Sequence, residues 1–239
     1  MAVSKIPAIA SWSGGKDSCL ACYKAMCGGY DIKYLLNFIS REYRRCCFHG
    51  VEEDLLKLQA QAIGIPLVQK AVTADMKEYE KEFKEAVAGL SSQDIGSIVF
   101  GDIYLADHAS WVERVCGELE IKPVEPLWDE HPAKVLEEFI DAGFKAVIVS
   151  CQAEKLGEEF VGKCLEKNMV KEFEARGVCP CGENGEFHTL VVDGPIFRQK
   201  IELLASEKVF KKDFWEYWFL DIKKYRLSDK QVDFSGLAK

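Results

Sequence analysis

Short apolar segments alternate with longer amphipathic segments through the first part of the chain. In residues 51–63, Leu55, Leu58 and Ala62 recur on one stripe, which predicts a helix with one buried face. The apolar segments are bounded by polar or glycine-containing turns, which is typical of buried parallel strands. We predict strands over residues 6–12, 33–40, 66–72, 97–100, 122–127 and 146–150, and helices over 19–27, 51–63 and 75–88, with further helices after Asp107 and between Pro132 and Gly143.

Strands that alternate with helices of this length predict an α/β fold with a doubly wound parallel sheet of five or slightly more strands. From residue 152 this alternation of predicted strands and helices ends. Residues 200–226 alternate apolar and polar positions as antiparallel strands do. We therefore expect a larger first domain over residues 1–130 and a smaller α+β domain over residues 131–239. Ligands of doubly wound sheets bind beyond the carboxyl ends of the strands.

The segment 13–18 lies between the first predicted strand and the first predicted helix and reads S-G-G-K-D-S. Glycines let a backbone approach an anion closely, and a helix N-terminus offers unpaired N–H groups and a partial positive charge. It is not a Walker A loop, because Ala10 lies five positions before Gly15 and Asp17 follows Lys16. An ordinary turn rich in small residues is the alternative. The candidate phosphate-binding residues are Ser13, Gly14, Gly15, Lys16, Asp17 and Ser18.

Two further segments reach the same edge of the predicted sheet. Ser40 and His49 lie in the loop after the second strand, where a nucleotide base would lie in this topology; local hydrogen bonding is the alternative for His49. Gly101 and Asp102 follow the fourth strand, where the carboxylate could hold Mg²⁺ or orient a substrate amine, or could cap the next helix. The predicted nucleotide contacts here are Ser40, His49 and Gly101, and the predicted metal ligands are Asp17 and Asp102.

Glu183, Glu186 and His188 lie close together in the glycine-containing loop 181–189. Two carboxylates and an imidazole on a turn-rich backbone suit proton transfer to and from an attacking amine. A solvated hairpin turn is the alternative. The predicted catalytic residues of the whole chain are Lys16, Asp17, Asp102, Glu183, Glu186 and His188.

Composition limits the partners. Among the 239 residues, 31 are Lys or Arg and 39 are Asp or Glu, so the formal charge is −8. An acidic chain is a poor default for nucleic acid or a membrane surface. The N-terminus lacks a charged region followed by a sustained apolar core, and no stretch resembles a transmembrane span. The ten cysteines include a run inside one predicted helix and a Cys179-x-Cys181 pair with the wrong spacing for zinc, so we expect a cytoplasmic protein with reduced thiols.

The segment 13–18 resembles the PP-loop signature S-G-G-x-D-S of the ATP pyrophosphatase superfamily, whose parallel sheet is of the HUP type. In that superfamily the loop holds the β- and γ-phosphates of ATP and leaves the α-phosphate open to attack. The resemblance therefore implies ATP as the nucleotide, Mg²⁺ as its cation, and AMP and pyrophosphate as products.

From about residue 9 to residue 201 the chain resembles the diphthine–ammonia ligase (diphthamide synthase) family. This resemblance implies an AMP-forming amide ligase. The carboxylate of diphthine, a modified histidine of translation elongation factor 2, attacks the α-phosphate, and ammonia then displaces AMP. The similarity is carried by the segment 13–18, by Phe48-His49, by residues 64–67, 101–103 and 126–128, and by the G-E-N-G-E-F run at 182–187.

Several positions depart from the family pattern. Asn184 and His188 stand where members that make diphthamide usually carry Gly and Glu, and the loop 41–47 is also unlike theirs. The helix after Asp102 lacks their usual Gln and Arg. These features resemble a bacterial-type branch, in which the acceptor is another carboxylate, with cobalamin salvage as one setting.

Two other functions stay open on the sequence. The cysteines would suit a tRNA-thiolating member of the adenine nucleotide alpha hydrolases, although the acidic charge weighs against tRNA. A nucleotide-binding sensor without turnover is the second, although it would have no use for the acids of the loop 181–189. The sequence also leaves a homodimer open.

Overall fold

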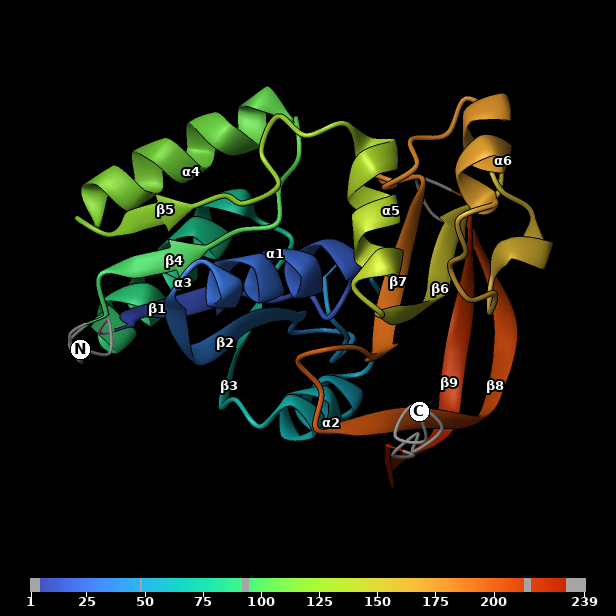
Figure 1. Ribbon diagram of the computed structural model, residues 1–239, viewed down its shortest axis with the longest axis horizontal. Coiled ribbons are helices and arrows are strands. Elements are labelled where there is room, and N and C mark those ends of the chain that lie inside the picture. Colours follow the sequence, from blue (N-terminus) through green and yellow to red (C-terminus); the bar gives the residue numbers. More distant parts are fainter. Residues whose placement is uncertain (1–4, 48, 92–94, 213–215, 231–239) are drawn as a thin grey trace, which may run out of the picture.

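The computed structural model describes residues 5–47, 49–91, 95–212 and 216–230 (Figure 1). Phe48, part of one motif quoted above, lies outside the described residues. Within these ranges, no helix combines the length and the hydrophobicity that a bilayer crossing requires.

The first part of the chain forms a five-stranded sheet in the order β3-β2-β1-β4-β5, with every neighbouring pair parallel. This arrangement confirms the predicted α/β sheet, and it places the first strand in the centre. The strands are β1 (Ile6–Ser11), β2 (Tyr30–Ser40), β3 (Leu67–Val72), β4 (Ser97–Val99) and β5 (Lys122–Val124).

Helices cover both faces of this sheet (Figure 1). The alternation of side chains along β1 shows the division, because Ala8 and Ala10 pack in one hydrophobic cluster and Ile9 packs in the other. The cluster of Ala8 contains the buried residues of α1 and α2, and that of Ile9 contains those of α3 and α4. The sheet is therefore doubly wound. The helices are α1 (Lys16–Cys27), α2 (Glu53–Ile63), α3 (Met76–Ser91) and α4 (Ala106–Glu118).

A second sheet follows helix α5 (Pro132–Asp141) and has the order β7-β6-β9-β8, with antiparallel pairs throughout. The prediction that the strand at 146–150 closes the first part of the chain is wrong, because β6 pairs with β7 and β9 instead. An apolar run indicates that a strand is buried on both faces, but it does not show which strand pairs with it. The strands are β6 (Lys145–Gln152), β7 (Phe187–Asp193), β8 (Gln199–Lys212) and β9 (Glu216–Asp229), and between β6 and β7 lie the 3₁₀ turn Glu158–Phe160 and α6 (Met169–Ala175).

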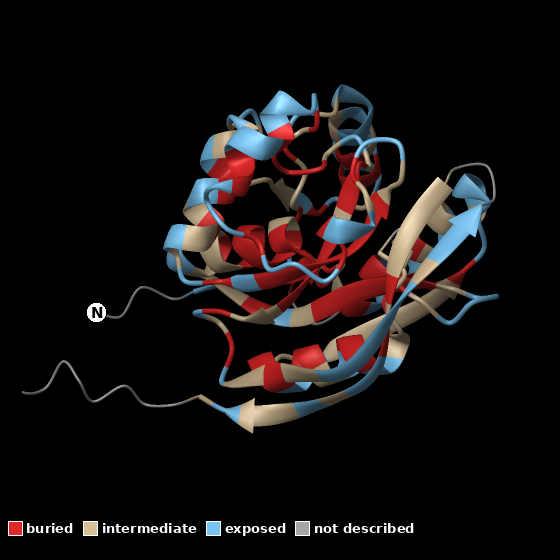
Figure 2. Ribbon diagram, turned by 90° about the vertical axis from the view of Figure 1, so that its right-hand side faces the viewer, coloured by how far each residue is buried: buried red, intermediate tan, exposed pale blue. Residues whose placement is uncertain are grey.

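One hydrophobic core joins the two parts. The largest cluster of buried side chains contains Leu20 of α1 and Leu56 of α2 together with Phe139 of α5 and Leu190 of β7. Figure 2 shows the buried residues gathered in the interior, whereas much of the β8–β9 hairpin is intermediate or exposed. The domain boundary at residue 130 stays a prediction, because the hydrophobic core is continuous across that position.

Phe83 offers a test of the packing on the α3–α4 face. Its ring is fully buried and lies 5.0 Å from the ring of Trp111 and 5.8 Å from that of Phe38, measured between centroids. We expect Phe83→Ala to lower the free energy of unfolding by about 3–5 kcal/mol, since the cavity cannot close around a rigid sheet. Phe210→Ala is the control, because Phe210 is 43% exposed and should cost less than about 1 kcal/mol. Urea denaturation measures both, and equal losses would contradict this account.

Candidate functional site

The carboxyl ends of β1 and β4 bring two predicted site segments into contact. A Cβ atom built on Gly101 would lie 2.8 Å from the carbonyl carbon of Asp17 and 3.0 Å from the amide nitrogen of Ser18. No side chain fits at that distance, so a glycine is required where the chain leaves β4. Gly101 therefore lies directly against the first turn of α1, as the edge-of-sheet argument predicts.

The glycines of the segment 13–18 are also required by their surroundings. Gly14 has a φ of +78°, and a Cβ atom there would lie 2.5 Å from Cδ2 of Leu56. A Cβ atom on Gly15 would lie 2.5 Å from Cε1 of His49. The loop thus bends in a left-handed conformation and is packed on both sides by other elements.

The two serines of the loop bind each other rather than project outward. Their hydroxyl oxygens are 3.2 Å apart. Ser13 also accepts a hydrogen bond of 3.3 Å from the amide of Gly15, and Ser18 donates one of 3.1 Å to the Gly15 carbonyl. These contacts hold the loop in shape, and both hydroxyls stand beside the N-terminus of α1.

Strand β7 crosses the loop and caps α1. The amide of Lys16 donates a 3.0 Å hydrogen bond to Oγ1 of Thr189, and the amide of Val191 donates one of 2.9 Å to the Gly14 carbonyl. One of the unpaired amides expected at this helix N-terminus is therefore already satisfied by a hydroxyl. The sequence carried no signal for Thr189, because its place depends on the register of β7 against the loop.

Lys16 is only 4% exposed and points into the protein. Its Nζ donates to Oδ2 of Asp17 at 2.8 Å and to the carbonyl of Cys181, and it lies 5.1 Å from the centroid of the Phe187 ring. Burial opposes the charged form, but Asp17 and, less strongly, Glu183 outweigh it and raise the pKa of Lys16. The group is therefore a buried ammonium ion.

Two carboxylates, Asp17 and Glu183, act on this ammonium group, and a third, Asp102, adds its charge to theirs. Oδ1 of Asp17 is buried without a hydrogen-bond partner, and Asp102 pairs with Nδ1 of His108 at 2.7 Å. Glu183 accepts a 2.9 Å hydrogen bond from the amide of Ile103. Burial first, and then the charges of Asp17 and Asp102, raise the pKa of Glu183. Glu183 therefore takes up a proton more readily than an ordinary glutamate.

Glu186 lies inside its own loop. It is 5% exposed and accepts hydrogen bonds from the amide of Cys179 at 3.1 Å, from the amide of Asn184 at 3.0 Å and from Nδ2 of Asn184 at 3.1 Å. Its contacts shape the turn that carries Glu183. A direct catalytic role for Glu186 stays a prediction. Its hydrogen bonds also stabilise the turn.

His49 and His188 pack against each other beside Gly15, with 4.7 Å between ring centroids. Nδ1 of His49 is 3.0 Å from the carbonyl oxygen of Thr189. Burial lowers the pKa of His49 to about 4 and lowers that of His188 well below its ordinary value. Both rings are therefore neutral near pH 7, and neither adds positive charge to the loop.

Ser40 does not join this group. It ends β2, and its hydroxyl accepts a 3.2 Å hydrogen bond from the amide of Tyr43 in the following turn. Among the hydrogen bonds of the described residues, it has none to the segment 13–18. Its place as a nucleotide contact stays a prediction, on the basis of its position at the end of β2.

Gln59 is a residue of the site that the sequence did not reveal. It is fully buried in α2, and its Nε2 donates to the carbonyls of Gly14 at 2.9 Å and Val191 at 2.7 Å. Its Oε1 accepts a 2.9 Å hydrogen bond from the indole N–H of Trp12. One side chain thus ties β1, the loop and β7 together. The only sign of this residue in the sequence is a polar position within a predicted helix, and such positions are common.

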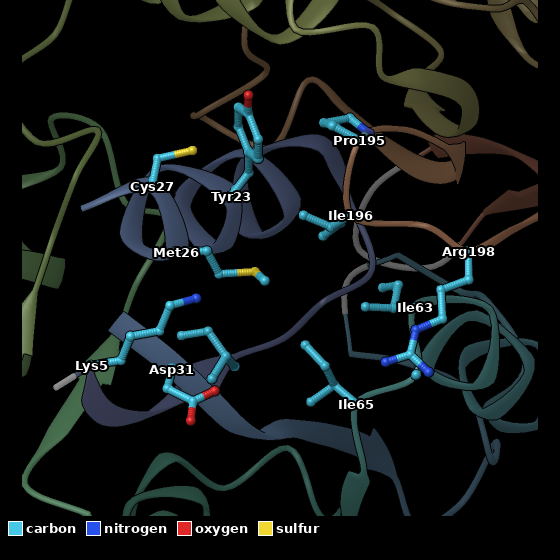
Figure 3. Close-up of a pocket in the computed structure, with 12 residues that line it drawn as sticks. Lys5, Tyr23, Met26, Cys27, Asp31, Ile63, Ile65, Pro195, Ile196 and Arg198 are labelled. Carbon is cyan, nitrogen blue, oxygen red and sulfur yellow. The ribbon is translucent and has the colours of Figure 1, made fainter. Parts of the chain in front are cut away.

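A pocket of about 540 Å³ lies at the opposite, amino-terminal edge of the parallel strands (Figure 3). It is lined by residues of α1 and α2 such as Tyr23, Met26 and Ile63, and by Arg198 after β7. None of the predicted site residues lines it. We therefore place the candidate functional site at the carboxyl edge, around the segment 13–18.

Two family models match most of the chain. The model for the diphthamide synthase N-terminal domain matches residues 6–123, and the model for the diphthamide synthase C-terminal domain matches residues 131–227. Together they include the segment 13–18, Asp102 and the loop that carries Glu183.

Proteins named diphthine–ammonia ligase are similar along most of this chain. The Danio rerio protein is 28% identical, with 91% of this chain and 95% of its own length covered. The Homo sapiens protein is 28% identical, with 82% of each chain covered. The Schizosaccharomyces pombe protein is 27% identical over 88% of this chain but only 38% of its own length. A predicted subunit of tRNA methyltransferase from Methanocaldococcus jannaschii has a TM-score of 0.45 and 15% identity, covering 80% of this chain and 98% of its own, too distant a likeness to inform function.

The role of Gln59 in holding the loop can be tested with a matched pair of substitutions. We expect Gln59→Met to lower the free energy of unfolding by at least about 2 kcal/mol and to weaken ATP binding several-fold, because buried backbone groups of the loop lose their partner. Gln61→Met is the control on the same helix, where the side chain is exposed. Urea denaturation and calorimetric titration with ATP measure the two effects. Unchanged ATP affinity in Gln59→Met would contradict a role in shaping the loop.

The histidine pair predicts a pH dependence of stability. In the unfolded chain both rings titrate near pH 6.5, whereas the folded protein holds them neutral to lower pH. As pH falls from about 6.5 toward 4, the unfolded chain takes up protons that the folded protein does not, so the free energy of unfolding decreases. We expect the loss between pH 7 and pH 5, measured with urea, to be smaller in the double variant His49→Gln/His188→Gln.

His131→Gln is the control for that experiment, since His131 is exposed ahead of α5. It should keep the wild-type pH dependence. A double variant with the same loss of stability as the wild type would show that the pair is not held neutral.

Proposed function

This chain belongs to the diphthamide synthase family, and we propose that it is an ATP-dependent ligase that joins ammonia to a carboxylate of the diphthine type. The names of its relatives support the reaction class, and the match to both domain models supports the whole unit. The single observation that carries the proposal is the contact between the glycine loop, Gly101 and the buried Lys16 at the carboxyl edge of β1 and β4.

The reaction proceeds in two steps. An oxygen of the acceptor carboxylate attacks the α-phosphorus of ATP, the bond to the bridging oxygen breaks, and pyrophosphate leaves. Ammonia then attacks the acyl carbon of the mixed anhydride, the bond to the AMP oxygen breaks, and AMP leaves with that electron pair. One proton is released as the amide forms. The protein therefore has to hold pyrophosphate and accept a proton.

The phosphates bind at the N-terminus of α1. Gly14 and Gly15 allow the backbone to approach them, and Ser13 and Ser18 add hydroxyl donors. Because Thr189 now occupies the amide of Lys16, a phosphate oxygen replaces that hydroxyl when ATP binds. Ser40 and His49 stand on the side where the nucleoside would lie.

Mg²⁺ enters with ATP as part of the substrate. In proteins this cation is held by one or two carboxylates together with substrate phosphates and water. Asp17 fits this need because its Oδ1 is buried without a partner, and Asp102, whose charge acts on Asp17, is the candidate for a second oxygen. Among the described residues, no group of three or more His, Cys, Asp or Glu side chains could hold a metal ion. The ion supplies charge compensation for the leaving pyrophosphate.

Glu183 takes the proton in the second step. Its raised pKa and its partial burial match what a general base for ammonia requires. Glu186 positions that carboxylate through the turn that it holds, and the neutral His188 is a second candidate acceptor.

The acceptor is diphthine of elongation factor 2 or a related carboxylate. Asn184 and His188, the two positions that depart from the family pattern, lie on either side of Glu186 and Phe187 in the same loop. They are the residues through which a bacterial-type acceptor would be selected. Elongation factor 2 as the partner protein, and a homodimer, stay predictions.

The cysteines do not favour thiolation chemistry. All ten are free, and burial raises the pKa of Cys22 and of Cys46 to about 12. A thiol in that state is a poor nucleophile at neutral pH. This observation favours amide formation over sulfur transfer.

The products of the reaction provide the test. Incubation with ATP, Mg²⁺, ammonium and candidate carboxylates should release AMP and pyrophosphate in equal amounts. Asp17→Asn should lower kcat/KM for ATP at least about 100-fold, because it removes charge from the cation site. Asp107→Asn, exposed in the first turn of α4, is the control and should keep wild-type activity. Release of ADP and phosphate would rule the proposal out.

A further inference from the structure

We propose that the pocket of atoms that now encloses the Lys16 ammonium group is the binding site for the ammonium substrate. The site becomes free when ATP draws Lys16 toward its phosphates. This inference rests on the proposed function, since it names the place and the order in which the second substrate binds. We call this pocket the ammonium cage and define it by Asp17, Cys181, Glu183 and Phe187.

The ammonium cage has the chemistry that recognises a small cation. Oδ2 of Asp17 accepts from Nζ at 2.8 Å, the Cys181 carbonyl accepts a second N–H, and the Phe187 ring centroid lies 5.1 Å away. The Glu183 carboxylate adds a second negative charge close by. Carboxylate, carbonyl and aromatic face together bind an –NH₃⁺ group, and an ammonium ion presents the same charge and the same donors.

The position of Lys16 makes the two substrates depend on each other. Its backbone belongs to the glycine loop, so its side chain can reach phosphates bound there. In the structure, the side chain instead lies in the cage, with donors committed to Asp17 and Cys181. Phosphates in the loop attract the same ammonium group. When Lys16 turns to them, the cage keeps its two carboxylates and loses its cation, and an ammonium ion restores the balance of charge.

The cage also places the proton acceptor beside the bound ion. Ammonium has no lone pair and must lose one proton before it can attack a carbonyl carbon. Glu183, whose charge acts on the Lys16 ammonium group, takes that proton, which leaves ammonia with a lone pair. The new C–N bond forms as the C–O bond to AMP breaks. AMP carries away the electron pair, and its phosphate oxygen takes the proton that the nitrogen loses as the amide forms. Lys16 meanwhile offsets the charge of the departing phosphates.

The first test uses a variant in which the cage is empty without nucleotide. Lys16→Met keeps an apolar stem of similar length but lacks the ammonium group. We expect ammonium chloride at 100 mM to raise the melting temperature of Lys16→Met by at least about 2 °C over sodium chloride at the same ionic strength. The wild-type protein should show no such difference, because Lys16 fills its cage.

Two other cations sharpen that test. Methylammonium, which resembles the lysine head group, should stabilise Lys16→Met, whereas tetramethylammonium has no N–H to donate to the Cys181 carbonyl and should not. Absence of any ammonium effect on Lys16→Met would overturn the proposal. This readout needs no turnover, so it stands apart from the question of whether the protein forms AMP.

The second test is kinetic and does not depend on the folding of Lys16→Met. Phe187→Leu removes the aromatic face, and we expect the KM for ammonium in amide formation to rise at least about fivefold. The KM for ATP, measured by exchange of pyrophosphate into ATP before ammonia is added, should change less than twofold.

Phe173→Leu is the matched control. Its ring stacks on Phe187 at 4.8 Å between centroids and is equally buried, but Nζ of Lys16 lies over the Phe187 ring. It should repeat any loss of stability and leave the KM for ammonium unchanged. Equal rises in that KM for the two variants would contradict the cage. Absence of AMP formation in the wild-type protein and in both variants would contradict the proposed function instead. The melting experiment would still test ammonium binding in the cage.

Discussion

The structure depends on the way β7 is held across the N-terminus of α1. Thr189 caps the first amide of the helix, and Gln59 binds the carbonyls of Gly14 and Val191 at the same time. A buried backbone carbonyl without a partner costs about 1–3 kcal/mol, so these few bonds decide how the second sheet sits on the first. The glycine loop and the loop that carries Glu183 are therefore parts of one site rather than two neighbouring surfaces.

Charge balance gives this site its chemistry. Lys16 is a buried cation beside Asp17 and Glu183, Asp102 adds its charge to those two carboxylates, and both nearby histidines are neutral. Such an excess of negative charge attracts cations, and we propose Mg²⁺ with ATP and an ammonium ion as the two that bind here. The acidity of the whole chain thus has a local counterpart at the carboxyl edge of β1 and β4.

Sequence reasoning succeeded where a short range of residues decides the outcome. The alternation of strands and helices and the convergence of Gly101 on the segment 13–18 are examples, because both follow from period and from the geometry of a parallel sheet. It failed for β6, whose apolar pattern is the same in either sheet. It also did not foresee that Glu186 is held by Cys179 and Asn184 within its own turn.

The sequence by itself determined the doubly wound fold, the place of the glycine loop at the start of α1, for which we predict phosphate binding, and the residue types that could serve ATP. These depend on local backbone freedom and on hydrophobic period, both of which can be read along one stretch of chain. Only the tertiary structure decided that Thr189 caps the loop, that Gln59 joins it to β7 and that Lys16 lies among Asp17, Cys181 and Phe187. Those contacts join residues far apart in the chain, and their distances exist only once the two sheets share a core.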